Sequence, residues 1–94
     1  MRFYADEVLT VGDSTPVNLT ASKLDHDGGA RASRATLQVK SGAIQACFVT
    51  DPTSDQSVKW TLDDIFEIIG YDNLKQVKFL SVSGDSTLYV TYET

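Results

Sequence analysis

The chain has 94 residues, of which 41% are hydrophobic and 22% are charged. This length fits one domain, residues 1–94, and excludes a two-domain enzyme with an interdomain cleft; the composition excludes a disordered tail, a coiled coil and a collagen-like chain. Eight Lys and Arg residues against thirteen Asp and Glu residues give a net charge of −5, which disfavours binding to nucleic acid or to an anionic membrane.

Cysteine content and targeting signals suggest the compartment in which the protein is made. The single Cys47 cannot form an internal disulfide or a multi-thiolate metal site, which suits assembly in a reducing cytoplasm. Residues 1–7 become acidic without an apolar segment, and the chain has no apolar run of 18 residues. We therefore expect neither a secretion signal nor a membrane span.

The first quarter of the chain alternates short apolar stretches with turn residues. Residues 8–11 and 17–20 are predicted to be short strands on either side of a turn at 12–16. Residues 21–33 show no sustained apolar period, so we expect a solvated loop there.

The clearest strand pattern lies in residues 34–40, where apolar and polar residues alternate with a period of two. Ser41 and Gly42 then separate this strand from a second apolar stretch at 43–49, which predicts a β-hairpin. Residues 50–56 are rich in Pro, Asp and Ser and are expected to reverse the chain.

Residues 62–69 fit two kinds of secondary structure. Thr61 followed by Asp63 and Asp64 is able to cap a helix, but the segment is short and rich in β-branched and aromatic residues. We therefore favour a strand.

The last quarter of the chain predicts a second hairpin. Residues 76–82 and 87–93 are expected to be strands joined by a turn at 83–86. About seven short strands at regular spacing predict an all-β fold, a single small antiparallel β-sandwich that is Ig-like or jelly-roll-like.

The most site-like string in the sequence is Asp25, His26 and Asp27, followed by two glycines. Two carboxylates and an imidazole are able to hold a divalent cation, but the spacing lacks the alternating ligands and closing Glu of an EF-type calcium loop. We favour a polar loop over a metal site. A catalytic role for His26 would need a nucleophile that the sequence does not indicate.

Other reactive groups have a simpler interpretation. Cys47 lies in an apolar strand, so we expect a small buried or half-buried side chain in preference to a reactive thiolate. Asp63 with Asp64, or Asp51 with Asp55, would supply paired carboxylates for glycoside hydrolysis, but a small sandwich offers little room for the cleft. The sequence thus predicts no enzyme and no cofactor.

Aromatic residues suggest either a sugar platform or packing. Trp60 and Tyr71 would cover apolar sugar faces if both rings were exposed. We favour core or interface packing for both rings, and core positions for Phe48, Phe66 and Phe79.

Five segments, in order, resemble a group of small structural proteins encoded among the head and tail genes of tailed bacteriophages. They are YADEVLTV (4–11), PVNLT (16–20), RATLQV (34–39), DPT (51–53) and TLYVTYE (87–93). The resemblance covers most of the chain and implies a virion structural protein without catalytic activity. A capsid decoration or cement protein is the first expectation, and a head-to-tail neck or tail component is the alternative.

The resemblance also implies partners and a location. We expect the protein to assemble in the host bacterial cytoplasm, to bind the major capsid protein of the virion as a homo-oligomer, and to contact neither nucleic acid nor membrane. A small carbohydrate-binding module remains an alternative from the residues alone. The expected contacts are an N-terminal arm within residues 1–7, the loop from Asp25 to Arg31, and two aromatic residues; the individual residues are Arg2, Phe3, Tyr4, Asp25, His26, Asp27, Arg31, Trp60 and Tyr71.

Overall fold

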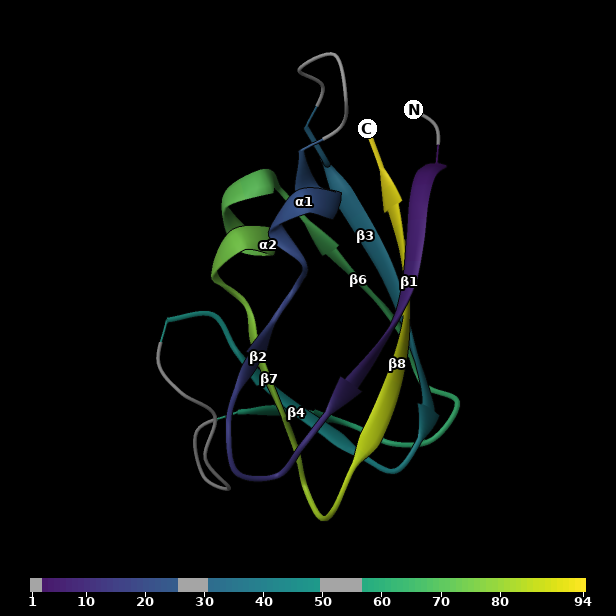
Figure 1. Ribbon diagram of the computed structural model, residues 1–94, viewed down its shortest axis with the longest axis vertical. Helices are drawn as coiled ribbons and strands as arrows, with labels where there is room; N and C mark the ends of the chain where they lie inside the picture. The colour runs from purple at the N-terminus through teal and green to yellow at the C-terminus, as the bar shows by residue number, and fades with distance from the viewer. Residues whose placement is uncertain (1–2, 26–30, 50–56) are drawn as a thin grey trace.

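The computed structural model describes residues 3–25, 31–49 and 57–94. Within these ranges the chain forms eight strands and two short helices (Figure 1). In chain order these are β1 (Phe3–Val11), β2 (Val17–Asn18), α1 (Ala21–Leu24), β3 (Arg34–Ser41), β4 (Ile44–Cys47), β5 (Val58–Trp60), β6 (Ile65–Ile69), α2 (Tyr71–Gln76), β7 (Lys78–Ser81) and β8 (Ser86–Glu93).

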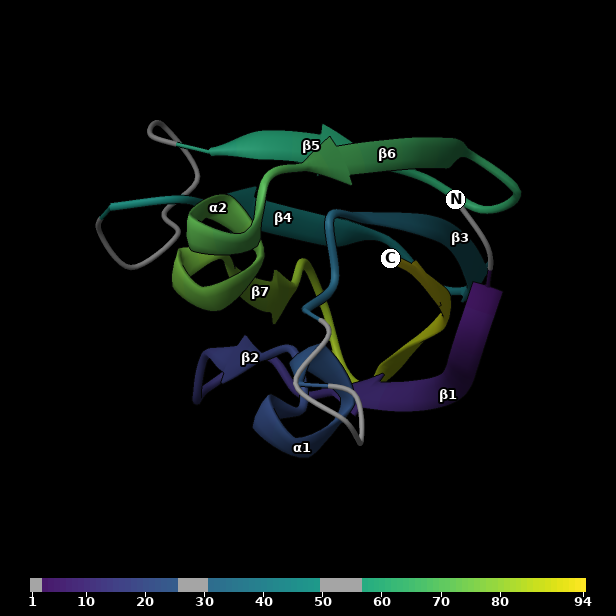
Figure 2. The same cartoon turned by 90° about the horizontal axis from the view of Figure 1, so that it is seen from above.

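The strands make two antiparallel sheets of four strands, which confirms the predicted all-β sandwich. The first sheet has the order β1-β8-β3-β6 and the second the order β2-β7-β4-β5. Figure 2 shows β5 and β6, one edge strand from each sheet, side by side where the chain passes from one sheet to the other. The apolar side chains of both sheets pack between them.

The alternating pattern of residues 34–40 appears in the structure as a strand with one buried face. Leu37 and Val39 of β3 are fully buried, as are Leu88 and Val90 of the neighbouring β8. Phe79 of β7 fills the opposite side of the same core. Burial of such side chains is the main stabilising contribution to the fold.

The two predicted hairpins are wrong, although their strands are present. β3 pairs with β6 and β8, whereas β4 pairs with β5 and β7, so the connection from β3 to β4 passes between the sheets. The connection from β7 to β8 also passes between the sheets. Each of these strands buries one apolar face, and a connection that changes sheet covers that face with a second layer.

The two connections between the sheets pack against each other. Gly42 has a φ of +74°, and a Cβ added there would lie 2.1 Å from Oγ of Ser86. The Ser86 hydroxyl donates to the carbonyl of Ala43 at 3.2 Å and lies 2.7 Å from the hydroxyl of Ser81. Glycine is therefore required at residue 42 both by its conformation and by the close approach of Ser86.

Residues 21–33 are not only a solvated loop, which corrects the prediction. α1 occupies the start of the segment, and Leu24 and Ala32 are both buried in the core. The amide of Ala32 donates to the carbonyl of Leu24 at 2.8 Å. Two isolated apolar residues are too few to give a periodic pattern, so only the packing identifies them.

α2, which the sequence pattern did not predict, follows β6 and closes the same end of the sandwich as α1. Leu74 of α2 and Val77 just after it are fully buried. Figure 1 shows both helices at the end of the molecule where β1 begins and β8 ends. The helices thus bring Asp25, at the end of α1, close to α2.

The N-terminal arm is a strand from Phe3 onward. Phe3 pairs with Glu93, and Ala5 to Val11 pair with Tyr92 to Ser86, with an irregular register between Phe3 and Ala5. These residues belong to the sheet because β8 offers them a complete ladder of backbone partners. Arg2 lies outside the described residues.

The strand interpretation of residues 62–69 is correct for β6. Asp64 accepts hydrogen bonds from the backbone amide and the hydroxyl of Thr61, at 2.8 and 3.2 Å, and so closes a turn before the strand. Asp63 in this turn has a φ of +70°. The polar residues that resembled a helix cap therefore terminate a loop.

Candidate functional site

Three of the residues expected to contact a partner lie together beside α2. The hydroxyl of Tyr71 donates to Oδ1 of Asp25 at 2.9 Å, and the guanidinium of Arg31 lies 4.6 Å from the centre of the Tyr71 ring. Asp25 and Arg31 also form an isolated antiparallel β-bridge. The helices bring these side chains together across 46 residues of sequence, and Lys75 approaches the same ring at 5.4 Å.

Tyr4 reaches the same cluster from β1. Its hydroxyl donates to the carbonyl of Lys23 at 2.5 Å. Burial, and then the charge of Asp25, raise the pKa of Tyr4, while the hydrogen bond to Asp25 raises the pKa of Tyr71. Both phenols therefore stay protonated at neutral pH and act as hydrogen-bond donors.

The metal-site hypothesis concerns residues that are only partly described, because His26 and Asp27 lie outside the described ranges. Within those ranges no three His, Cys, Asp or Glu side chains gather as metal ligands. Asp51 and Asp55 are likewise outside the described residues, and Asp64 closes the turn with Thr61. Cys47 is half-buried on β4, within the expectation of a buried or half-buried side chain.

Trp60 lies in a different setting from Tyr71. Its ring stacks on Phe66 with the ring centres 3.7 Å apart and the planes 7° from parallel. Because Trp60 is on β5 and Phe66 on β6, this pair joins the edges of the two sheets. Packing thus covers one face of the indole, as the packing interpretation predicts.

The outer face of the first sheet is a surface that spans all four strands of that sheet. Side chains that alternate with the buried ones form three rows across β1, β8, β3 and β6. The rows are Phe3, Glu93, Arg34 and Ile69; Asp6, Thr91, Thr36 and Glu67; and Val8, Tyr89, Gln38 and Ile65. We call these twelve residues the outer face.

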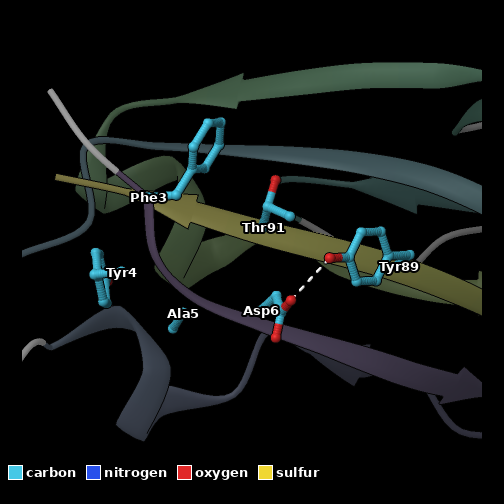
Figure 3. A pocket seen from close by; sticks show the side chains of 6 residues that line it. All are labelled: Phe3, Tyr4, Ala5, Asp6, Tyr89 and Thr91. Carbon is cyan, nitrogen blue, oxygen red and sulfur yellow. Dashed lines mark hydrogen bonds between the residues drawn. The ribbon is translucent and has the colours of Figure 1, made fainter.

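Two open depressions meet on the outer face. The larger, of about 450 Å³, is lined by Phe3, Tyr4, Ala5, Asp6, Tyr89 and Thr91 (Figure 3). The smaller, of about 160 Å³, is lined by Thr36, Leu37, Gln38, Ile65, Tyr89 and Thr91. Tyr89 and Thr91 of β8 border both, so the two depressions lie on either side of the same strand.

Three of the four charged groups of the outer face have a partner on that face, and the fourth is Glu93. Asp6 accepts a hydrogen bond from the hydroxyl of Tyr89 at 2.8 Å, as Figure 3 shows, and this bond raises the pKa of Tyr89. Arg34 forms an ion pair with Glu67 at 3.6 Å, and its Nε is buried without an acceptor among the described residues. The row from Val8 to Ile65 contains no charged residue, and Lys40, two residues further along β3, donates to Oε1 of Gln38 in this row at 3.4 Å.

Sequence reasoning found one residue of the outer face, Phe3, and missed the others. The signal was present in β6, where Ile65 and Ile69 point outward while Ile68 points into the core. A strand that is apolar on both faces exposes one of them unless a further layer covers it. That pattern indicates a contact surface.

Comparisons with known proteins add no relative. A scan against protein-family models gives no match, and a search of curated proteins gives no significant match. In the described part of the chain no helix is long and apolar enough to cross a membrane.

Proposed function

We propose that this chain is a structural protein of a tailed-bacteriophage virion, a capsid decoration or cement protein that binds the outer shell and bridges its subunits. The observation that carries the proposal is the outer face of the first sheet, a broad exposed surface with apolar side chains along both edges. Exposed apolar groups gathered on one surface are typical of a contact with another protein.

Two features of the sequence supply the rest of the proposal. The five segments named above occur in an order that resembles small phage structural proteins. This resemblance is the reason for proposing a phage protein that is part of the virion. The net charge of −5 disfavours contact with packaged DNA, so the proposal puts the protein on the outside of the shell. The partner is then the major capsid protein.

A bridging protein needs more than one contact. Either a symmetric oligomer repeats the outer face, or one protomer uses a second surface. The cluster of Tyr4, Asp25, Arg31 and Tyr71 supplies hydrogen-bond donors and charges for that second contact. Many weak contacts of this kind add up on a repeating shell.

Quantitative mass spectrometry of purified virions of the phage that encodes the chain tests the proposal. Its copy number is compared with that of the major capsid protein in the same particles. A ratio of the same order as the shell protein supports decoration. A small, ring-like copy number would assign the protein to the neck or tail instead, and its absence from the particle would overturn the virion proposal.

A glycan array separates the proposal from a carbohydrate-binding module. The wild-type protein is tested beside Trp60→Ala, because an aromatic ring face would supply the sugar contact. The decoration proposal expects no binding by either protein. Binding that is lost in Trp60→Ala would favour the carbohydrate module.

A further inference from the structure

We propose that the outer face of the first sheet is the surface that docks on the shell, and that it binds an uncharged, aliphatic and hydroxyl-bearing surface of the shell protein. This inference rests on the proposed function and names the contact that it uses. The argument depends on where the exposed apolar groups lie, on the charge of the face and on its area.

Exposed apolar side chains concentrate on this face. Among the described residues eight large hydrophobic side chains are exposed, and four of them belong to the outer face. Phe3 and Val8 on β1 are 62% and 64% exposed, and Ile65 and Ile69 on β6 are 65% and 62% exposed. They line both edges of the sheet, and single exposed hydrophobics scattered over a surface would not show such an arrangement.

The centre of the face carries hydroxyl and amide groups. Thr36, Gln38, Tyr89 and Thr91 lie on the two middle strands, between the apolar edges. Three of the four charged residues of the face, Asp6, Arg34 and Glu67, hold a hydrogen bond or an ion pair within it, and the fourth, Glu93, lies at the end of β8. A centre made of hydroxyl and amide side chains, with Lys40 bonded to Gln38 at its margin, matches the anatomy of a protein interface, which is depleted of charge at its core and enriched in tyrosine.

The area of the face favours a repeating partner over a second copy of the chain. Four strands at about 4.8 Å spacing and about seven residues at about 3.4 Å each give a plane of about 450 Å². A stable pair of proteins buries about 800 Å² on each partner, so two free copies would bind weakly through this face. Their equal negative charges oppose the contact further.

Neither the small area nor the like charge of two identical copies limits binding to the shell. It is a different protein, and it repeats the same surface many times around the particle. An oligomer that presents several outer faces gains avidity from each added contact, so a small area per copy is sufficient. The two depressions beside Tyr89 and Thr91 would then receive small side chains that protrude from the shell surface.

The test uses phage particles that lack the protein and the purified full chain. Bound copies are measured after sedimentation, for the wild type and for four variants. Ile65→Glu and Ile65→Lys place either sign of charge on the face. Val82→Glu and Val82→Lys are the matched controls, because Val82 is 48% exposed and lies outside the face, between β7 and β8. Thermal unfolding first confirms that all five proteins fold.

We expect both Ile65 variants to lower the affinity for the particles by about tenfold or more, whatever the sign of the charge. Both Val82 variants should bind like the wild type. Raising NaCl from about 50 mM to about 500 mM should change wild-type binding little, because apolar contacts are not screened by salt.

Four other results would overturn the inference in distinguishable ways. Wild-type binding that both Ile65 variants retain would remove the outer face from the contact and leave the proposed function standing. If only one of the two Ile65 variants lost binding, or if the wild type lost binding in high salt, the contact would be electrostatic. No binding by the wild type would overturn the proposed function as well, and a dimer in sedimentation that the Ile65 variants dissolve would identify a second copy as the occupant.

Discussion

The two faces of β8 differ in how tightly their surroundings constrain each residue. Leu88, Val90 and Tyr92 point inward and have no exposed surface, whereas Tyr89 and Thr91 point outward and are half-buried. Dense packing fixes the size and shape of an inward residue. An outward residue is free of that constraint. Its polarity and charge therefore indicate what kind of surface it contacts.

The same contrast appears in two tyrosine and carboxylate pairs that join β1 to β8. Tyr92 donates to Glu7 inside the sandwich, and Glu7 also accepts the hydroxyl of Thr20 at 2.6 Å. Tyr89 donates to Asp6 on the outer face. Two consecutive acidic residues of β1 therefore accept hydrogen bonds from tyrosines on opposite faces of the sheet. The contributions of the two hydrogen bonds to the free energy of unfolding can be compared.

The largest effect on stability is expected when a core residue of β3 is truncated, compared with truncation of its outward-facing neighbour. Leu37→Ala should lower the free energy of unfolding by about 2–5 kcal/mol, because it removes buried methyl groups and leaves a cavity. Gln38→Ala, one residue along the same strand, should change it by about 0.5 kcal/mol or less. Urea unfolding of both variants checks this, and similar losses would contradict the assignment of the two faces.

The next effect separates the two tyrosine pairs. Tyr92→Phe should cost about 1–3 kcal/mol of unfolding free energy, because the half-buried carboxylate of Glu7 loses one of its two hydroxyl donors. Tyr89→Phe should leave the unfolding temperature unchanged, since water replaces the lost partner of Asp6. Calorimetry of both proteins tests the contrast, and an equal cost for the two variants would argue against it.

A smaller effect should appear in alkaline solution. Burial and the hydrogen bond to Glu7 raise the pKa of Tyr92 above the ordinary value of 10.0. As the pH rises, the unfolded chain therefore loses the Tyr92 proton at a lower pH than the folded chain. The stability that Tyr92 contributes is fully present below pH 10 and decreases as the pH rises above about 10. Unfolding free energies between about pH 9 and 11 should fall less steeply in Tyr92→Phe than in the wild type. Equal pH dependence of the unfolding free energy in the two proteins would show that Tyr92 does not cause the loss of stability at high pH.

The smallest effect on stability is expected on the outer face itself. Val8→Thr combined with Ile65→Thr should change the unfolding free energy by about 0.5 kcal/mol or less, because threonine suits an exposed strand position. Retention on a hydrophobic-interaction column should nevertheless fall. A large loss of stability would mean that these side chains serve the fold and not a contact.

Several features of the molecule were predictable from the sequence because their causes are local. The alternation in residues 34–40 and 87–93 determines which side chains of β3 and β8 are buried, and the β-branched residues of 62–69 favour β6 as a strand. The all-β class follows from these strands. The sequence singled out Tyr4, Asp25, Arg31 and Tyr71 as expected partner contacts, which stays a prediction, but it did not indicate that they form one cluster.

Only the tertiary structure decided how these pieces combine. A period of two specifies which face of a strand is buried but not which sheet the strand joins, so the crossings at Gly42 and Ser86 were not predictable. The bond from Tyr71 to Asp25 and the rows of the outer face join residues far apart in the chain. Such contacts depend on strand order, which arises from packing the whole core and leaves no local signal in the sequence.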